Sequence, residues 1–331
     1  MKNADRILLM EPIVPLVEPL LEQRFAVRRY WQGGADEAAG ALAGIRGIAT
    51  GRKARVDRDL MDRMPGLEIV ARFGAGYDSI DVAEAARRRI VVTNTPGVLS
   101  DEVADLAMGL LIASARRLVE AERFLREGRW SKAATFPLSP TLRGRHAGIF
   151  GLGSIGRAIA ARCRAFGMQV SYHGRRRQPD APYPYYERLI DMAAAVDVLM
   201  VAAPGGSATF HAVDAPVLQA LGPDGIVVNV GRGSIVDEAA LVQALRERRI
   251  LGAGLDVFEK EPAFPPELLD RECVVLTPHV GSCSTHTHDA MGRLMVDNLY
   301  AYFDGRGPLN PVPETPWPFA PASGEMEKAR P

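Results

Sequence analysis

The sequence predicts an α/β protein built from two doubly wound parallel-sheet domains, and three observations support this prediction. Short apolar runs alternate with helical patterns along almost the whole chain, which is the element order of such folds. The chain has 331 residues, about twice the length of an ordinary domain. Hydrophobic residues account for 47% of it, which suits a protein with large buried cores.

Along the first part of the chain, five short apolar runs predict strands. They lie near residues 7–10, 25–27, 47–50, 67–71 and 90–93, with helices between them. The turn-forming run 94–97 ends this series, and a long helix with an apolar face is predicted to follow it. We expect Ser100 to cap that helix, with Asp101 and Glu102 in its first turn.

A second α/β series predicts six further strands, near residues 147–150, 168–173, 197–202, 226–230, 252–257 and 274–276. Between the two series, residues 129–140 have weak periodicity and are expected to form a long loop or arm. A last helix, about 287–303, has no strand after it, so we expect it to pack back on the first domain. Residues 305–331 are rich in Pro and Gly, which predicts a tail that trails over the surface or is disordered.

The charge balance and the cysteines exclude some classes of protein. Lys and Arg total 40, as do Asp and Glu, so there is no electrostatic reason to expect nucleic acid or an anionic membrane as partner. No signal peptide fits the polar start of the chain, and no apolar stretch reaches the roughly 20 residues that span a bilayer. The three cysteines lack Cys-x-x-Cys spacing, which favours a reducing compartment such as the cytoplasm.

A glycine-rich segment, Gly151-Leu152-Gly153-Ser154-Ile155-Gly156, follows one predicted strand and opens a helix. Alone, such a motif also marks an ordinary Gly-rich turn, but the flanking strands and helix supply the context of a dinucleotide site. Gly151 permits the tight turn, Gly153 lets a pyrophosphate approach the backbone, and Gly156 allows close helix packing. The helix N-terminus then binds the phosphates through its free N–H groups.

The end of the next strand bears on which dinucleotide binds. An NAD site places Asp or Glu there, where it accepts a hydrogen bond from the ribose 2′-hydroxyl. This chain has His173-Gly174-Arg175-Arg176-Arg177 instead, which offers no carboxylate and three guanidinium groups for a 2′-phosphate. A solvated basic turn is the alternative interpretation. The segment favours NADP over NAD.

Three strand ends of the second series carry polar residues that an apolar core does not need. Arg232 lies between two glycines in 229–233, Glu261 lies in 254–262, and His279 lies in 277–282. Because the carboxyl ends of parallel strands form the ligand crevice, we expect these loops to face one site. Reduction of a 2-oxo acid needs a cation that polarises the carbonyl and an acid that protonates its oxygen. Arg232 and His279 suit these tasks, and Glu261 would fix the tautomer of His279. Each alone is as compatible with a structural role, so the evidence is their joint appearance after a dinucleotide motif.

Taken together, these motifs resemble those of the D-isomer-specific 2-hydroxyacid dehydrogenases. The similar segments are 71–78, 94–97 with 104–106, the Gly151 loop, 229–233, 255–262 and 278–279, and the resemblance covers the chain to about Phe303. It implies that Arg232, Glu261 and His279 form the catalytic set, and that the cofactor is NADP or NAD. It also implies a homodimer, with an arm near Trp130 that crosses between subunits.

The resemblance further implies a Rossmann cofactor domain inserted in a discontinuous, flavodoxin-like substrate domain. The substrate domain would span 1–98 and 288–315, the Rossmann domain 99–287, and a tail 316–331. Substrate contacts are expected at Arg72, Ala75 and Gly76, with the substrate carboxylate on the backbone of the last two. Asp256 is expected to contact the nicotinamide amide. The expected cofactor-binding residues are Val103, Gly151, Gly153, Ser154, Ile155, Gly156, Gly174, Arg175, Arg176, Pro204, Thr209, Val230, Gly231, Asp256 and Gly281.

Within that family, residues 72–76 and 203–206 are most similar to the glyoxylate/hydroxypyruvate reductase branch, whose near relatives reduce hydroxyphenylpyruvate or 2-ketogluconate. One segment departs from the family, which tends to have acidic or small residues and an Arg after Ser282. Here the chain has Cys283-Ser284-Thr285-His286-Thr287-His288. A metal site on Cys283, His286 and His288 fits no common zinc spacing, so a capped helix start is the better interpretation and no metal is expected.

The sequence therefore predicts a cytoplasmic oxidoreductase that reduces a small 2-oxo acid to the D-2-hydroxy acid by hydride transfer. No nucleic acid or membrane is expected as partner. The alternative is a dinucleotide-sensing regulator without turnover, since a complete Rossmann site also serves sensors and corepressors. Oxidation of a reduced nicotinamide by a 2-oxo acid separates the two.

Overall fold

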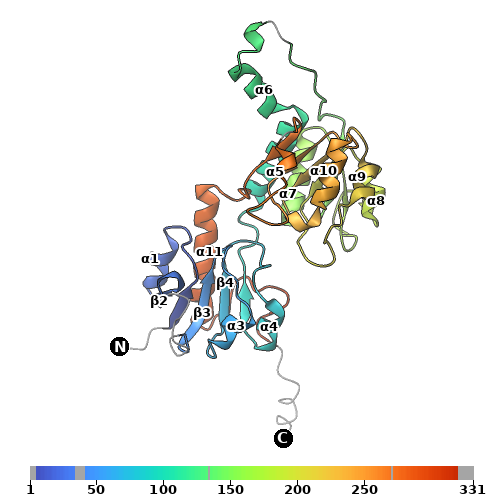
Figure 1. Cartoon of the computed structure of the whole chain (residues 1–331). Coiled ribbons are helices and arrows are strands. Elements are labelled where there is room, and N and C mark those ends of the chain that lie inside the picture. The colour runs from blue at the N-terminus through green and yellow to red at the C-terminus, as the bar shows by residue number, and fades with distance from the viewer. Residues whose placement is uncertain (1–4, 34–41, 133–134, 270, 320–331) are drawn as a thin grey trace. The chain divides into compact units, whose positions relative to one another are not determined.

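The structure is a computed structural model that describes residues 5–33, 42–132, 135–269 and 271–319 (Figure 1). The chain divides into two compact units, Met1–Leu99 with Ser284–Pro331, and Ser100–Cys283. Each unit has its own parallel sheet. The last helix, α11 (Thr285–Phe303), returns to the first unit, which is therefore discontinuous, as the resemblance implied.

The sheet of the first unit contains all five strands predicted for it. They are β1 (Arg6–Leu9), β2 (Ala26–Arg29), β3 (Ile45–Thr50), β4 (Ile69–Arg72) and β5 (Val91–Thr93). They are parallel and lie in the order β2-β1-β3-β4-β5. This is the flavodoxin-like order, in which the direction of strand addition across the sheet reverses between β1 and β3.

Helices cover both faces of this sheet because successive strand residues point to opposite sides. On one face, Met295, Val296 and Leu299 of α11 share a core with Ile7 and Leu9 of β1. Each such side chain, fully buried, contributes about 1.5–3 kcal/mol to folding. Leu8, from between those two strand residues, belongs to the core of the other face. The remaining helices of the unit are α1 (Val17–Glu22), α2 (Tyr30–Gly33), α3 (Arg58–Asp62) and α4 (Val82–Arg87).

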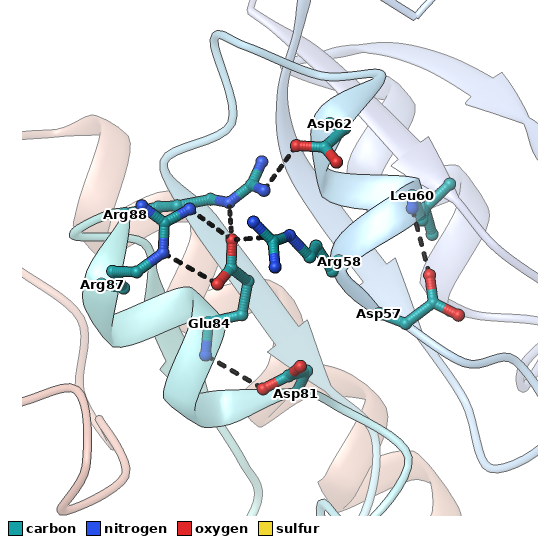
Figure 2. A network of polar contacts seen from close by, with 8 residues as sticks. All are labelled: Asp57, Arg58, Leu60, Asp62, Asp81, Glu84, Arg87 and Arg88. Carbon is teal, nitrogen blue, oxygen red and sulfur yellow. Dashed lines mark hydrogen bonds and ion pairs between the residues drawn. The ribbon is translucent and has the colours of Figure 1, made fainter.

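Figure 2 shows a polar network that joins helices α3 and α4. The carboxylate of Glu84 accepts hydrogen bonds from Arg87 and Arg88, each at 2.6 Å, and Arg58 lies 4.0 Å away. Arg88 also donates to Asp62 at 2.5 Å. The hydrogen bonds from Arg87 and Arg88 lower the pKa of Glu84 to about 2.

The segment after α11 corrects the prediction of a trailing tail. Val312 is buried, and its N–H donates to the carbonyl oxygen of Val92 in β5 at 2.9 Å. Thr315 is fully buried beside the same strand. The side-chain oxygen of Asn298 accepts the N–H groups of Leu309 and Asn310, both at 2.9 Å, which fixes the start of the segment. The prediction was therefore wrong up to residue 319, and residues 320–331 lie outside the described part of the chain.

The sheet of the second unit contains the six predicted strands and one more. They are β6 (His146–Phe150), β7 (Gln169–His173), β9 (Val198–Val201), β10 (Ile226–Asn229), β11 (Gly252–Leu255) and β12 (Val274–Leu276), with β8 (Tyr185–Tyr186) in addition. The order β8-β7-β6-β9-β10-β11-β12 is that of a Rossmann sheet, in which two halves diverge from its first strand, with a seventh strand at one edge.

The helices of the second unit are α5 (Ser100–Ala115), α6 (Leu118–Arg126), α7 (Ser154–Ala165), α8 (Leu189–Ala193), α9 (Ala215–Leu221) and α10 (Glu238–Arg246), with short 3₁₀ turns at Trp130–Lys132, Gly233–Ile235 and Pro266–Leu268. Ser100 does not cap α5 as predicted. It is the first helical residue, and its buried hydroxyl has no hydrogen-bond partner in the described structure. Asp101 and Glu102 do lie in the first turn.

Residues 129–140, predicted as a loop or arm, contain the turn Trp130–Lys132 and otherwise no regular structure in their described part, which omits 133–134. Figure 1 shows this segment and α6 extending away from the sheet of their own unit. Among the helices described, none is both long and apolar enough to cross a membrane.

Candidate active site

The glycine-rich loop after β6 has the geometry that a dinucleotide pyrophosphate requires. Gly151 has φ +96°, and a Cβ there would lie 2.6 Å from the Cα of Ala203. A Cβ at Gly156 would lie 2.0 Å from the carbonyl oxygen of Gly151, so α7 packs tightly on the turn. At Gly153 a Cβ would meet no atom within 4 Å, which leaves the backbone open to a ligand. These are the three roles expected of the glycines.

Helix α7 begins directly after this loop and offers its first-turn amides. It is 12 residues long, and no side chain caps it at Gly153. Ser154 and Ile155 therefore present backbone N–H groups at the positive end of the helix dipole, where an anion binds. Loop and helix together fit the phosphates of a dinucleotide.

The basic segment after β7 contains three exposed arginines. Arg175, Arg176 and Arg177 have no hydrogen bond or ion pair with any other residue that the structure describes. A nearby carboxylate, Asp180, is instead paired with Arg157 at 2.9 Å. A Cβ at Gly174 would meet no protein atom within 4 Å. The end of β7 therefore has room and positive charge for a phosphate.

The other expected cofactor residues of this unit are Val103 on α5, Pro204 and Thr209 after β9, Val230 and Gly231 after β10, and Gly281 after β12. The hydroxyl of Thr209 donates to the carbonyl oxygen of Pro204 at 2.8 Å, which closes the loop after β9. A Cβ at Gly231 would lie 2.7 Å from the carbonyl oxygen of Ala203 in that loop. The ends of β9 and β10 are therefore in direct backbone contact.

His279 and Glu261, expected to act together, are hydrogen-bonded. Nδ1 of His279 lies 2.9 and 2.8 Å from the two carboxylate oxygens of Glu261. Glu261 also accepts the N–H of Phe258 at 3.2 Å, which orients the carboxylate. Because Nδ1 must carry a proton to donate to Glu261, Nε2 is the nitrogen left to exchange a proton with a substrate.

The backbone of His279 is held in a conformation that side chains rarely adopt. Its φ is +55°, in the left-handed region, which costs about 1–2 kcal/mol. Its N–H donates to the carbonyl oxygens of Asp256 at 2.8 Å and Thr277 at 3.0 Å. The buried carboxylate of Asp256 accepts from the Thr277 hydroxyl at 2.6 Å and from the N–H groups of Val280 and Gly281, both at 2.8 Å. Asp256 thus orients the loop that carries His279.

Arg232 lies in a tight loop that packs on the segment leading to Glu261. The buried amide of Asn229 bridges that loop, donating to the carbonyl oxygen of Arg232 at 2.9 Å and accepting the N–H of Gly231 at 3.0 Å. A Cβ at Gly233 would lie 1.8 Å from the carbonyl carbon of Phe258. Only glycine permits this backbone contact, which joins the loops of Arg232 and Glu261.

Two further residues hold the Glu261 segment, and the sequence did not indicate either. Glu238, at the start of α10, accepts the N–H of Glu259 at 2.8 Å, and burial raises the pKa of Glu238. Nε2 of His211 lies 3.3 Å from the carboxylate of Glu259. Neither residue belongs to a recognisable motif, and each partner is distant in the sequence, so pattern analysis had no signal for them.

In the first unit, the loop after β4 presents two backbone amides. The carbonyl oxygen of Ala75 accepts from Asn94 at 2.7 Å, and that of Gly76 accepts from Arg72 at 3.1 Å. The hydroxyl of Thr95 accepts the N–H of Gly74 at 3.0 Å. In the described residues the N–H groups of Ala75 and Gly76 have no acceptor, so they are available to a carboxylate. Arg72 is buried, and the hydrogen bond of its Nε shapes the loop.

The segment that departs from the family forms the start of α11. The hydroxyl of Ser284 accepts the N–H of Thr287 at 3.1 Å, so the predicted capped helix start is confirmed. His288 packs edge-on against Phe73 with ring centroids 5.5 Å apart, and His286 is exposed. Within the described residues no group of His, Cys, Asp or Glu side chains has a metal-binding arrangement.

Comparison with known proteins agrees with this geometry. The family model for the D-isomer specific 2-hydroxyacid dehydrogenase, NAD binding domain, matches residues 108–281. Hydroxyphenylpyruvate reductase of Plectranthus scutellarioides is 43% identical over 312 residues, 94% of this chain and 99% of that protein. Glyoxylate/hydroxypyruvate reductase A of Arabidopsis thaliana is 44% identical over 310 residues, 92% of this chain and 98% of that protein.

Solved structures give the same result. An NADPH-dependent glyoxylate/hydroxypyruvate reductase from Sinorhizobium meliloti, in complex with NADP and malonate, superposes with a TM-score of 0.90 at 49% identity. The match covers 96% of this chain and all of that one. The resemblance found in the motifs is thereby confirmed, and the chain belongs to the D-isomer-specific 2-hydroxyacid dehydrogenase family.

Proposed function

We propose that this chain reduces glyoxylate, hydroxypyruvate or a close analogue to the D-2-hydroxy acid, as a member of a family of NAD(P)H-dependent 2-oxo acid reductases. The observation that carries the proposal is the hydrogen-bonded pair of His279 and Glu261, in the unit that contains the dinucleotide loop. The relatives named above are all reductases. The alternative of a sensing regulator without turnover therefore gains no support from them.

The proposed roles follow from the chemistry of each side chain. When bound, the reduced nicotinamide supplies the hydride for the carbonyl carbon. Arg232 grips the substrate and polarises its carbonyl, and Nε2 of His279 gives a proton to the oxygen as it becomes an alkoxide. Glu261 holds the proton on Nδ1 and stabilises the imidazolium that donates. The N–H groups of Ala75 and Gly76 bind the substrate carboxylate.

Asp256 is proposed to accept a hydrogen bond from the nicotinamide amide. A carboxylate offers about four acceptor positions. In Asp256, one oxygen accepts from Thr277 and Val280 and the other accepts from Gly281. One position therefore remains for a cofactor amide, which is consistent with the proposed contact.

NADPH is proposed as the preferred reductant. The support is the exposed guanidinium groups of Arg175 and Arg176, which pair with no acid among the described residues, and the space at Gly174. Charge-assisted hydrogen bonds of this kind contribute about 1.5–3 kcal/mol each when partly shielded from water. The similar Sinorhizobium meliloti enzyme is described as NADPH-dependent.

A homodimer is proposed from the apolar surface of the arm. Trp130 is 70% exposed and Leu138 fully exposed, and Leu118, Val119 and Leu125 of α6 are also largely exposed. Apolar side chains gathered on a projecting segment mark an interaction surface. Light scattering of the wild type should give the mass of a dimer. Leu125→Glu with Trp130→Glu should shift it to a monomer, and a wild-type monomer would refute the proposal.

A panel of 2-oxo acids tests the proposed function. Glyoxylate, hydroxypyruvate, hydroxyphenylpyruvate and 2-ketogluconate are each mixed with NADPH or NADH. The configuration at C2 is determined for every product except glycolate, which is achiral. We expect the highest kcat/KM with glyoxylate or hydroxypyruvate, and D-glycerate from the latter. Formation of L-glycerate, or a preference for the aromatic or sugar acid, would contradict it. Fractionation of the source cells, in which we expect the protein with the cytoplasmic enzymes, tests the proposed location.

A further inference from the structure

Two neighbouring loops of the first unit run side by side at the carboxyl edge of its sheet. One follows β3 and spans residues 51–55, and the other follows β4 and spans residues 74–78. At one end the N–H of Phe73 donates to the carbonyl oxygen of Thr50 at 2.9 Å. At the other end the N–H of Val56 donates to the carbonyl oxygen of Ser79 at 3.0 Å. The second loop carries the N–H groups of Ala75 and Gly76, for which the described residues offer no acceptor.

The first loop is built around a carboxylate that follows β1. Glu11 accepts the N–H groups of Lys53 at 3.0 Å and Ala54 at 3.2 Å. A Cβ at Gly51 would lie 2.7 Å from the same carboxylate oxygen, so a larger residue there would displace Glu11. The loop is therefore held by its backbone, and its side chains are not needed to fix it.

Those side chains are cationic and exposed. Arg52, Lys53 and Arg55 are all exposed to solvent. The side chains of Lys53 and Arg55 pair with no acid in the described structure. Three carboxylates lie near the two loops. The oxygens of Glu11 are engaged by backbone amides, Asp78 is on the neighbouring loop, and Glu314 accepts from the hydroxyl of Tyr77 in that loop at 3.2 Å. Lys53 and Arg55 thus present two positive charges that no acid in the described residues neutralises, on the loop beside the amides of Ala75 and Gly76.

We propose that the preferred substrate of this reductase carries a second anionic group, which Lys53 and Arg55 bind while the amides of Ala75 and Gly76 hold the 2-oxo carboxylate. This rests on the proposed function of those amides. Neighbouring strands lie about 4.8 Å apart, a distance that a chain of a few carbons spans. A carboxylate or a phosphate at the far end of a short 2-oxo acid has the required charge and reach.

The test compares substrates that differ in the second charge. The pairs are 2-oxoglutarate with 2-oxopentanoate, and phosphohydroxypyruvate with hydroxypyruvate, each assayed with NADPH and glyoxylate as reference. We expect kcat/KM for one charged member to exceed that of its neutral partner by about tenfold or more, as one charge-assisted pair provides. The ratio should fall as ionic strength rises. The pair with the larger ratio distinguishes a carboxylate from a phosphate.

Variants assign the effect to the loop. Lys53→Gln and Arg55→Gln should each lower the charged-to-neutral ratio by about fivefold or more, and Lys53→Arg should largely retain it. Arg246→Gln removes one exposed positive charge from α10 and should leave the ratio unchanged. A wild type that reduces glyoxylate but shows no preference for either charged substrate overturns this inference and leaves the proposed function intact. A preference for the charged substrate that survives both Lys53→Gln and Arg55→Gln also overturns this inference. A wild type that reduces none of these acids refutes the proposed function itself.

Discussion

Nδ1 of His279 lies 2.8 Å from the nearer carboxylate oxygen of Glu261, although 17 residues separate the two in the chain. Both side chains are about 30% exposed. An imidazole that has a carboxylate on one nitrogen is set to donate a proton from the other.

Replacing the acid of this pair should slow the reaction. In Glu261→Gln the imidazole of His279 loses the carboxylate that orients it and keeps the proton on Nδ1. We expect kcat/KM for 2-oxo acid reduction to fall by about tenfold or more, with the fold retained. The measurement is steady-state kinetics with circular dichroism as control. Full activity of a well-folded variant argues against the pairing in catalysis.

Arg232 should not be replaceable by lysine. A planar guanidinium grips a carboxylate or carbonyl with two parallel hydrogen bonds, which a single ammonium does not reproduce. Arg232→Lys should lose about 2–4 kcal/mol of transition-state stabilisation, or about 30- to 1,000-fold in kcat/KM. Steady-state kinetics with the best substrate measures this. Near-full activity would remove Arg232 from the catalytic set.

Cofactor preference should depend on the segment after β7. Wild type is expected to prefer NADPH by roughly tenfold to a few hundredfold in kcat/KM, and less at high salt. Gly174→Asp with Arg175→Ser should shift preference toward NADH, because it adds a ribose acceptor and removes a phosphate partner. The empty space at Gly174 lets the new side chain fit without a clash. Equal or better use of NADH by the wild type would refute this prediction.

The backbone contact at Gly233 should be intolerant of a single methyl group. A Cβ there would lie 1.8 Å from the carbonyl carbon of Phe258, so the Arg232 and Glu261 loops must separate. Gly233→Ala should cost about 1–3 kcal/mol of stability and most of the activity. The matched control is Gly109→Ala on α5, which has open space and should be neutral or stabilising by about 0.5–1 kcal/mol. Thermal unfolding and kcat/KM are measured for both variants. A fully active Gly233→Ala would show that the Arg232 and Glu261 loops need not be in backbone contact.

The Glu84 network should stabilise the first unit in a pH-dependent way. The pKa of Glu84 falls from 4.5 to about 2 in the folded protein, so the network stabilises the folded state fully above about pH 4.5. That stabilisation is lost as pH falls toward 2. Glu84→Gln should therefore lower Tm near neutral pH, and the difference from wild type should shrink below pH 4.5. A difference that stays constant with pH would show that the carboxylate charge is not involved.

Much of the fold could be predicted because apolar runs mark buried parallel strands. The strands predicted from such runs are all present within about two residues at their ends. Strand β8 was missed because Tyr185 and Tyr186, which directly follow Pro184, are too short a run to carry a pattern. The segment around Val312 was misjudged for a different reason. Proline and glycine argue against helix and strand, but not against burial beside β5.

The site could be predicted only as far as local motifs extend. Arg232, Glu261 and His279 each follow a recognisable strand, and the topology of a parallel sheet brings strand ends to one edge. His211 and Glu238 act through a partner far away in the chain, Glu259. Such contacts depend on how loops of different length meet, which no local pattern encodes.

In the proposed reaction the chain turns over 2-oxo acids by hydride transfer, with His279 as the proton donor. The most direct measurement is the loss of NADPH absorbance on mixing with glyoxylate, for wild type and for His279→Gln at the same ionic strength. We expect steady oxidation by the wild type and a loss of about 100-fold or more in the variant, because the variant lacks the general acid. No oxidation by the wild type with glyoxylate or hydroxypyruvate, or full activity of a folded His279→Gln, would contradict it.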